Sequence, residues 1–334
     1  MLRERFPETL ARAVPRVVFC AGFFDGVHVG HRALLAAAVA EARARHSVPA
    51  VLTMDPHPLA VLRPDAAPAL VVPETERRLA LLSGAGMEAC LLLPFTRETA
   101  ATSPEDFVRV TFGPWLRDPD RSCFLVCGPN WRFGAGRAGT PEALPALSGG
   151  RMGVRVEPLA EAGGAPVSSS RVRVAVREGD VALAAALLGR PWETPVSALG
   201  AARGRGVGTR LGAPTANACL SGALRPACGV YALDVRLAGE DAWRRAVANY
   251  GFRPTFPDAR PDEPLLEIHL LGGFEGDLHG RRMDVRWLAR IRDERAFSSP
   301  AALAAQIKAD VSAAADFGKS GQWRRNGPPG PETA

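Results

Sequence analysis

The sequence predicts an α/β domain followed by an all-β domain, and two patterns carry this prediction. In the first half, short apolar runs alternate with segments of helical character; the runs are residues 17–21, 50–53, 89–93 and 123–127. This alternation is typical of a parallel, doubly wound sheet. After Trp192 the chain changes to short strands separated by turn residues, which is typical of a small antiparallel barrel. We therefore expect domains at residues 1–190 and 191–317, and a disordered, proline-rich tail at residues 318–334.

The composition is that of a globular protein that binds anionic ligands. Of the 334 residues, 47% are hydrophobic and 23% are charged, and the formal net charge is +6. Because the arginines are scattered and only 7% of residues are aromatic, we expect no nucleic-acid-binding surface. The first residues lack the apolar core of a signal peptide, and no run approaches the roughly eighteen apolar residues of a membrane helix. The six cysteines lack metal-ligand spacing, so we expect free thiols and a cytoplasmic protein.

The segment at residues 22–31 reads Gly-Phe-Phe-Asp-Gly-Val-His-Val-Gly-His and joins an apolar strand to an alanine- and leucine-rich helix. A helix start that faces a turn offers unpaired N–H groups and a partial positive charge to a phosphate. His28 and His31 are three residues apart at that start, so their imidazoles should share one face. Such a pair suits the charge that develops on a nucleoside triphosphate during in-line displacement. The alternative is that one histidine caps the helix and the other lies on the surface.

Two further loops of the first domain follow predicted strands, where parallel sheets bind ligands. Residues 54–58 hold His57 between two prolines, and residues 128–139 contain four glycines, Asn130 and two arginines. Each has a plainer interpretation, because polar residues favour turns and a glycine-rich loop alone is weakly specific for phosphate. A helix then opens at Ser168-Ser169-Ser170. Hydroxyl groups there can cap the helix or bind phosphate, and Arg173 follows close enough to reach the same phosphate oxygens.

The second domain contains a basic, glycine-rich run at residues 203–210, followed by Pro214-Thr215-Ala216-Asn217. Taken alone, this tetrapeptide is as readily a proline-initiated turn as a functional motif. In the later segment Leu266-Glu267-Ile268-His269-Leu270, the alternation puts Glu267 and His269 on the same face of a strand. A solvent-facing glutamate on an edge strand is the alternative interpretation of Glu267.

Together and in this order, these segments resemble the bacterial bifunctional riboflavin kinase/FAD synthetases. Residues 22–31 carry the His-x-Gly-His signature of cytidylyltransferase-like nucleotidyltransferases, and residues 214–217 are similar to the Pro-Thr-Ala-Asn signature of riboflavin kinases. The resemblance implies a Rossmann-like nucleotidyltransferase domain and a six-stranded antiparallel riboflavin-kinase barrel with a terminal helix. It also implies two activities. Riboflavin is phosphorylated to FMN with ATP and Mg²⁺, and AMP is then transferred from ATP to FMN, which gives FAD and pyrophosphate.

For adenylyl transfer, the resemblance implies that His28 and His31 hold the charge of the triphosphate. The other contacts to ATP that it implies are Gly22, Phe24, Asp25, Gly30, Asn130, Ser169, Ser170 and Arg173. The implied flavin contacts are Asp55, His57 and Pro58.

For the kinase, the resemblance implies that Thr215 and Asn217 bind Mg²⁺ and phosphate through side-chain oxygens. Glu267 would accept the proton of the attacking ribityl hydroxyl. The remaining implied contacts are Gly208 and Gly212 to phosphate and Arg253 to the flavin.

The second domain departs from the family pattern at Thr209, Ala213, Gly272 and His279. These departures leave open an FAD synthetase whose barrel binds flavin as a regulatory module without kinase activity. A nicotinamide mononucleotide or phosphopantetheine adenylyltransferase would share His-x-Gly-His but would not explain residues 214–217. We expect small-molecule substrates as the only partners, with no nucleic acid and no membrane, and the sequence leaves homo-oligomers open.

Overall fold

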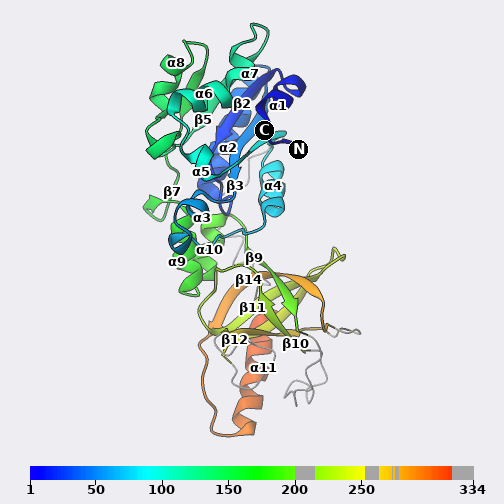
Figure 1. Ribbon diagram of the computed structural model, residues 1–334. Helices are drawn as coiled ribbons and strands as arrows, with labels where there is room; N and C mark the ends of the chain where they lie inside the picture. Colours follow the sequence, from blue (N-terminus) through cyan, green and yellow to red (C-terminus); the bar gives the residue numbers. More distant parts are fainter. Residues whose placement is uncertain (200–214, 253–262, 273, 275–277, 318–334) are drawn as a thin grey trace. The chain divides into compact units, whose positions relative to one another are not determined.

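The computed structural model describes residues 1–199, 215–252, 263–272, 274 and 278–317. The chain forms two compact units, Met1–Ser168 and Ser169–Ala334, which are described separately below (Figure 1). Because the division falls after Ser168, the two helices that follow it group with the barrel. The boundary between catalytic domains that we expect at residue 190 rests on motif order and stays a prediction.

The N-terminal unit is built on a six-stranded parallel sheet with the strand order β1-β4-β3-β2-β5-β6. Its strands are β1 (Leu2–Glu4), β2 (Arg16–Ala21), β3 (Val48–Asp55), β4 (Ala89–Pro94), β5 (Ser122–Cys127) and β6 (Gly153–Val156). The parallel, doubly wound sheet predicted from the alternation of strands and helices is confirmed. A separate two-stranded ribbon pairs β7 (Glu161–Ala162) with β8 (Ala165–Pro166).

Helices cover both faces of this sheet (Figure 1). They are α1 (Pro7–Ala13), α2 (Val29–Ala44), α3 (Pro58–Leu62), α4 (Thr75–Gly84), α5 (Arg97–Ala100), α6 (Pro104–Thr111), α7 (Gly113–Leu116) and α8 (Leu144–Leu147). Three short 3-10 turns, at Pro64–Ala66, Ala135–Arg137 and Pro141–Ala143, complete the unit.

Alternate residues of β2 enter two separate cores, one on each face of the sheet. Phe19 packs with residues of α1, α6, α7 and α8, whereas Val18 and Cys20 pack with residues of α2 and α4. Burial on both faces explains why the strands read as nearly continuous apolar runs. All six cysteines of the chain are free thiols, four of them buried. Burial raises the pKa of Cys90, Cys123 and Cys127 to about 12, so these thiols are unreactive.

The C-terminal unit begins with two helices, α9 (Ser169–Arg177) and α10 (Val181–Leu188). Six antiparallel strands then close into a barrel in the order β10-β13-β12-β11-β14-β9. The strands are β9 (Trp192–Ala198), β10 (Thr215–Leu220), β11 (Gly229–Leu237), β12 (Arg244–Gly251), β13 (Leu265–Leu270) and β14 (Arg282–Arg292), and α11 (Pro300–Asp316) follows them. The predicted six-stranded antiparallel barrel with a terminal helix is confirmed.

Large aromatic side chains fill the barrel. Trp192 and Trp287 stack with ring centroids 5.5 Å apart, and Tyr231 meets Trp287 edge-on at 4.9 Å. Outside the barrel, α11 is fixed by a bidentate ion pair, in which Arg292 of β14 donates to both carboxylate oxygens of the buried Asp310. The helix therefore covers the outer face of β11 and β12, where Val230, Ala232 and Val247 pack against Ala314.

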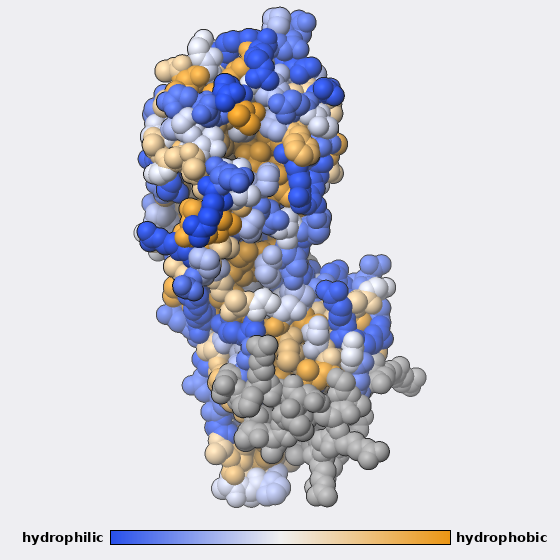
Figure 2. Space-filling model, viewed as in Figure 1, coloured by the Kyte–Doolittle hydropathy of each residue, from blue (hydrophilic) through white to orange (hydrophobic). Residues whose placement is uncertain are grey.

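No helix within the described ranges is both long and apolar enough to cross a bilayer. Figure 2 shows hydrophilic and hydrophobic residues interspersed over the visible face of the N-terminal unit.

Candidate active sites

The two histidines of the segment 22–31 lie in contact at the start of α2. His28 is the N-cap residue, and its Nδ1 accepts a hydrogen bond of 3.1 Å from the backbone N–H of His31. The two rings are stacked, with centroids 3.6 Å apart and planes within 12° of parallel. The expectation that the imidazoles share one face is confirmed. Capping and pairing are not alternatives here, because His28 does both.

The environment of His31 keeps its ring neutral. Burial, and secondarily the nearby charge of His28, hold the pKa of His31 well below its usual value. Its buried Nδ1 has no hydrogen-bond partner among the described residues. A neutral imidazole with an unpartnered nitrogen beside a helix N-terminus can form a hydrogen bond with a phosphate oxygen.

The backbone of the turn before α2 is tightly constrained. Phe24 and Val27 have positive φ angles of 61° and 43°, which for the β-branched Val27 is a strained conformation. The buried carboxylate of Asp25 accepts hydrogen bonds from the backbone N–H groups of Val71 (2.9 Å) and Val72 (3.2 Å). These bonds tie the turn to a segment 46 residues away in sequence. Hydrogen bonds from residues outside the turn therefore stabilise its conformation.

Two glycines of the turn allow side chains to approach closely. A Cβ atom on Gly22 would lie 3.0 Å from the ring of Phe24, and one on Gly30 would lie 3.2 Å from Nδ1 of His28. The buried Phe24 ring in turn meets His31 edge-on at 5.2 Å. The packing of Phe24 and the two glycines thus supports the histidine pair.

The loop 54–58 lies beside this turn, as expected for the carboxyl ends of neighbouring parallel strands. Nδ1 of His57 accepts the N–H of Leu59 at 3.1 Å and so caps α3. The His57 ring meets the ring of Phe23 edge-on at 4.5 Å. Asp55 accepts a hydrogen bond of 2.9 Å from the hydroxyl of Thr75. His57 thus connects its own loop to the histidine-bearing turn through Phe23.

Arg78 of α4 is a member of this neighbourhood that the sequence analysis missed. Its side chain is only 1% exposed, its Nη2 donates to the backbone oxygen of Met54 at 3.1 Å, and its guanidinium lies 4.1 Å from the ring centroid of Phe23. Burial lowers the pKa of Arg78, whereas the carboxylates of Asp55 and Asp25 act in the opposite direction. No sequence signal marks Arg78, because one of two adjacent arginines on an amphipathic helix reads as a solvated residue.

The glycine-rich loop 128–139 follows β5 and is closed by its own arginines. Arg132 donates to the backbone oxygens of Pro129 and Trp131, and Arg137 donates to that of Asn130 at 3.2 Å. Phe133 and Gly139 form a β-bridge, in which a Cβ on Gly139 would collide with the Phe133 ring at 2.5 Å. These bonds fix the backbone at Asn130.

In the C-terminal unit, Ser169 and Ser170 open helix α9 as predicted. Arg173 lies one turn later, and its Nη2 donates to the hydroxyl oxygen of Ser170 at 3.1 Å.

A second polar cluster lies on the barrel. Strand register places Asn217 of β10 opposite Glu267 of β13, and Glu267 opposite Asn249 of β12. Glu267 and His269 are half-buried while their neighbours Leu266, Ile268 and Leu270 are buried, so the predicted shared face is confirmed. It is the outer face of the barrel. The Asn249 side chain donates to Glu294 at 3.1 Å.

Two features of this cluster bear on ligand binding. The Oδ1 atom of Asn217 is buried and has no hydrogen-bond partner within the described ranges, which is costly unless a ligand supplies one. Burial lowers the pKa of His269, against the opposing effect of the charge on Glu267. Thr215 pairs with His269 in the strand register. Gly208, Thr209, Gly212, Ala213 and Arg253 lie outside the described residues.

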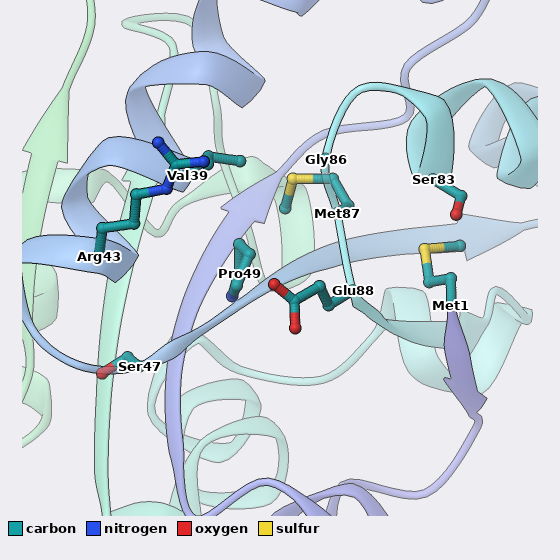
Figure 3. Close-up of a pocket in the computed structure, with 9 residues that line it drawn as sticks. All are labelled: Met1, Val39, Arg43, Ser47, Pro49, Ser83, Gly86, Met87 and Glu88. Atoms are coloured by element: carbon teal, nitrogen blue, oxygen red, sulfur yellow. The ribbon is translucent and has the colours of Figure 1, made fainter.

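A cavity of about 460 Å³ lies elsewhere in the N-terminal unit. Figure 3 shows Arg43, Ser47, Pro49 and Glu88 among its lining residues, which come from the end of α2 and the starts of β3 and β4. This is the amino-terminal edge of the parallel sheet. Because the turn 22–31, the loop 54–58 and Asn130 all follow the carboxyl ends of strands, the cavity is not part of that site.

Comparison with known proteins finds two family models, one in each half of the chain. The model described as FAD synthetase matches residues 11–171, and the model described as riboflavin kinase matches residues 195–317.

Curated relatives match over nearly the whole length. A bifunctional riboflavin kinase/FMN adenylyltransferase of Bacillus subtilis is 33% identical over 88% of this chain and 90% of its own. The protein of the same description from Escherichia coli K12 is 36% identical over 90% and 92%, and that from Pseudomonas fluorescens is 37% identical over 88% and 90%. A crystal structure of a protein described as a macrolide-efflux protein of Streptococcus pneumoniae is 26% identical, with a TM-score of 0.77 over 95% of this chain and 99% of that one.

Proposed function

Because this chain belongs to the family of bifunctional riboflavin kinase/FMN adenylyltransferases, we propose that the two polar clusters described above are its two active sites. The enzyme phosphorylates riboflavin to FMN with ATP and transfers AMP from a second ATP to FMN, which gives FAD. The two family models match separate halves of the chain, so each half carries one reaction.

In the proposed adenylyl-transfer site, a phosphate oxygen of FMN attacks the α-phosphorus of ATP, and the bond to the bridging oxygen of pyrophosphate breaks. The observation that carries this assignment is the stacked His28–His31 pair at the start of α2, with the unpartnered Nδ1 of His31. Both histidines would contact the triphosphate and stabilise the charge that develops on the leaving pyrophosphate.

The remaining contacts of this site are proposed from the family resemblance. For ATP they are Gly22, Phe24, Asp25, Gly30, Asn130, Ser169, Ser170 and Arg173, and for FMN they are Asp55, His57 and Pro58. The structure supports rigid backbone positions for the turn and for Asn130. Phe24 and Asp25 are buried, so their contribution would be to hold the turn rather than to touch solvent-exposed parts of ATP.

In the proposed kinase site, Glu267 accepts the proton of the ribityl hydroxyl as this oxygen attacks the γ-phosphorus of ATP, and the bond from the γ-phosphorus to the bridging oxygen breaks to release ADP. Asn217 lies beside Glu267 in the strand register, and its buried, unpartnered Oδ1 fits an oxygen ligand of Mg²⁺. Thr215 would supply a second oxygen, and Mg²⁺, when bound, neutralises charge on the phosphates. The proposed roles of Gly208 and Gly212 at phosphate and of Arg253 at the flavin concern residues outside the described ranges.

The two departures that the structure describes lie outside the strands that carry Asn217 and Glu267. Gly272 has a φ of 83° with open space around it, which suits the turn after β13, and His279 is exposed in a turn before β14. We therefore favour an active kinase over a regulatory flavin-binding barrel. We further propose a cytoplasmic enzyme whose partners are its small-molecule substrates, with no role for nucleic acid or membrane.

One experiment tests the proposal as a whole. Purified protein is incubated with riboflavin, ATP and Mg²⁺, and the flavins are separated by chromatography. FAD as the end product is the expected result. Accumulation of FMN would contradict the proposed adenylyl-transfer site. Unchanged riboflavin, with FAD formed when FMN is supplied, would contradict the proposed kinase site. No conversion of either flavin would overturn both assignments.

A further inference from the structure

Arg78 is a buried cation that the mechanism above does not use. It belongs to α4, and its side chain is 1% exposed. Its Nε atom is buried and has no hydrogen-bond partner in the part of the chain that the structure describes. Burying a guanidinium with incomplete hydrogen bonding is costly, so its other contacts must compensate.

Those contacts reach two substrate loops at once. On the flavin side, Nη2 donates to the backbone oxygen of Met54, next to Asp55, whose carboxylate also interacts with the Arg78 charge. On the triphosphate side, the guanidinium lies 4.1 Å from the centre of the Phe23 ring, and the buried Asp25 is the second carboxylate that interacts with it. A single side chain thus contacts the turn 22–31 and the loop 54–58.

The contact with Phe23 extends to a proposed flavin-binding residue. Phe23 carries Arg78 against its face and meets the ring of His57 edge-on at 4.5 Å. The backbone oxygen of Phe23 also accepts the hydroxyl of Thr53 at 3.3 Å, which fixes the residue from a third direction. The Phe23 ring therefore joins Arg78 to His57.

We propose that Arg78 is a positioning residue for adenylyl transfer, which acts through Phe23 and Met54 to hold the flavin loop against the histidine-bearing turn. The inference rests on the proposed assignment of these loops to FMN and ATP. Because Arg78 donates directly to Met54 of the flavin loop and reaches His57 of that loop through Phe23, its loss should affect FMN more than ATP. A merely structural residue would lower the amount of folded enzyme without changing the ratio of the two KM values.

The test compares Arg78→Met, which keeps an unbranched chain but removes charge and donors, with Arg78→Lys, which keeps the charge. Arg109→Met is the matched control, since Arg109 pairs with Asp106 at the exposed surface of the same unit. Rates of FAD formation are measured against FMN and against ATP, and riboflavin phosphorylation in the same preparation reports on the other half of the chain.

For Arg78→Met we expect the KM for FMN to rise about tenfold or more, with a smaller rise for ATP, because a displaced positioning group costs substrate alignment. Arg78→Lys should recover part of this loss, and Arg109→Met should match the wild-type enzyme. Arg78→Met combined with Phe23→Leu should raise the KM by less than the product of the two single effects, since both act through one contact.

An unchanged KM for FMN in folded Arg78→Met overturns the inference, as does an equal loss of both activities. If Arg78→Met does not fold, the KM for FMN is measured in Arg78→Lys and in Phe23→Leu instead. An unchanged KM in both variants overturns the inference, and a raised KM in both supports it. Failure of the proposed function is a separate result, because the wild-type protein would then form no FAD from FMN and ATP.

Discussion

The imidazole rings of His28 and His31 are stacked 3.6 Å apart, and His28 is bound to the backbone N–H of the residue whose ring it covers. A positive charge on His31 is therefore disfavoured both by burial and by the charge of His28, and the pKa of His31 is lowered.

Replacing His31 by alanine should abolish FAD formation and leave riboflavin phosphorylation intact. The variant removes the unpartnered Nδ1 that we assign to the triphosphate, whereas the kinase cluster lies in the other unit. Flavin chromatography after incubation with riboflavin, ATP and Mg²⁺ should therefore show FMN as the end product. His46→Asn is the control, because His46 is exposed just after α2 at a positive φ of 50° that asparagine tolerates. Loss of both activities would show that the two sites are not independent.

The low pKa of His31 should make the folded protein less stable in mild acid. The unfolded chain binds a proton at the usual histidine pKa of about 6.5, whereas the folded ring resists protonation because it is buried and faces His28. Stability from this residue is complete above that pH and is lost as the pH falls below it, by at most about 1.4 kcal/mol per pH unit. Urea unfolding at several pH values between 7.5 and 5 should show a shallower loss for His31→Gln than for the wild-type protein. Identical pH profiles would contradict the lowered pKa of His31.

Replacing Glu267 by glutamine should impair riboflavin phosphorylation and leave FAD formation from FMN intact, which is the reverse of the effect expected for His31→Ala. Glutamine keeps the size of the side chain but cannot accept the ribityl proton, and loss of a general base costs about 10²–10⁴ in rate. FMN formation should fall by that factor, while FAD formation from supplied FMN continues. Glu240→Gln, which affects surface ion pairs with Arg244 and Arg281 away from the Asn217–Glu267 row, serves as the control. Unchanged riboflavin phosphorylation in Glu267→Gln would remove Glu267 from the mechanism.

Replacing Asp310 by asparagine should weaken the attachment of α11 to the barrel. The substitution leaves Arg292 without its bidentate carboxylate at a site where Asp310 is only 4% exposed, and breaking such a pair costs about 3 kcal/mol. Asp106→Asn breaks a solvent-exposed Asp–Arg pair and should cost much less, because solvent screens such a pair. Urea unfolding measures both, and equal effects of the two substitutions would show that α11 is held by other contacts.

The parts of the fold that the sequence predicted are those encoded by local patterns. Apolar runs identified β2, β3, β4 and β5, and the spacing of His28 and His31 was sufficient to place both rings on one face. The alternation of Leu266 to Leu270 gave the correct face for Glu267. In each case the periodicity of one element determines the outcome.

The features that the sequence could not predict depend on contacts between distant segments. Strand β1 has only three residues and forms because it pairs with β4, some 87 residues later. The bonds from Val71 and Val72 to Asp25 join segments 46 and 47 residues apart, and Arg78 of α4 is buried where it donates to Met54 of β3. The alignment of Asn217, Glu267 and Asn249 depends on barrel register, which no single strand contains.

The strand order of the two units has a consequence for behaviour at high concentration. The barrel is closed and offers no edge, while the parallel sheet ends in β1 and β6, of three and four residues. Both edges carry ion-paired arginines, Arg3 with Glu76 on β1 and Arg155 with Glu41 on β6. Short, charged edges are poor templates for pairing with strands of another molecule. The native enzyme should therefore resist sheet-to-sheet aggregation, and aggregation should begin only after one of the two units opens.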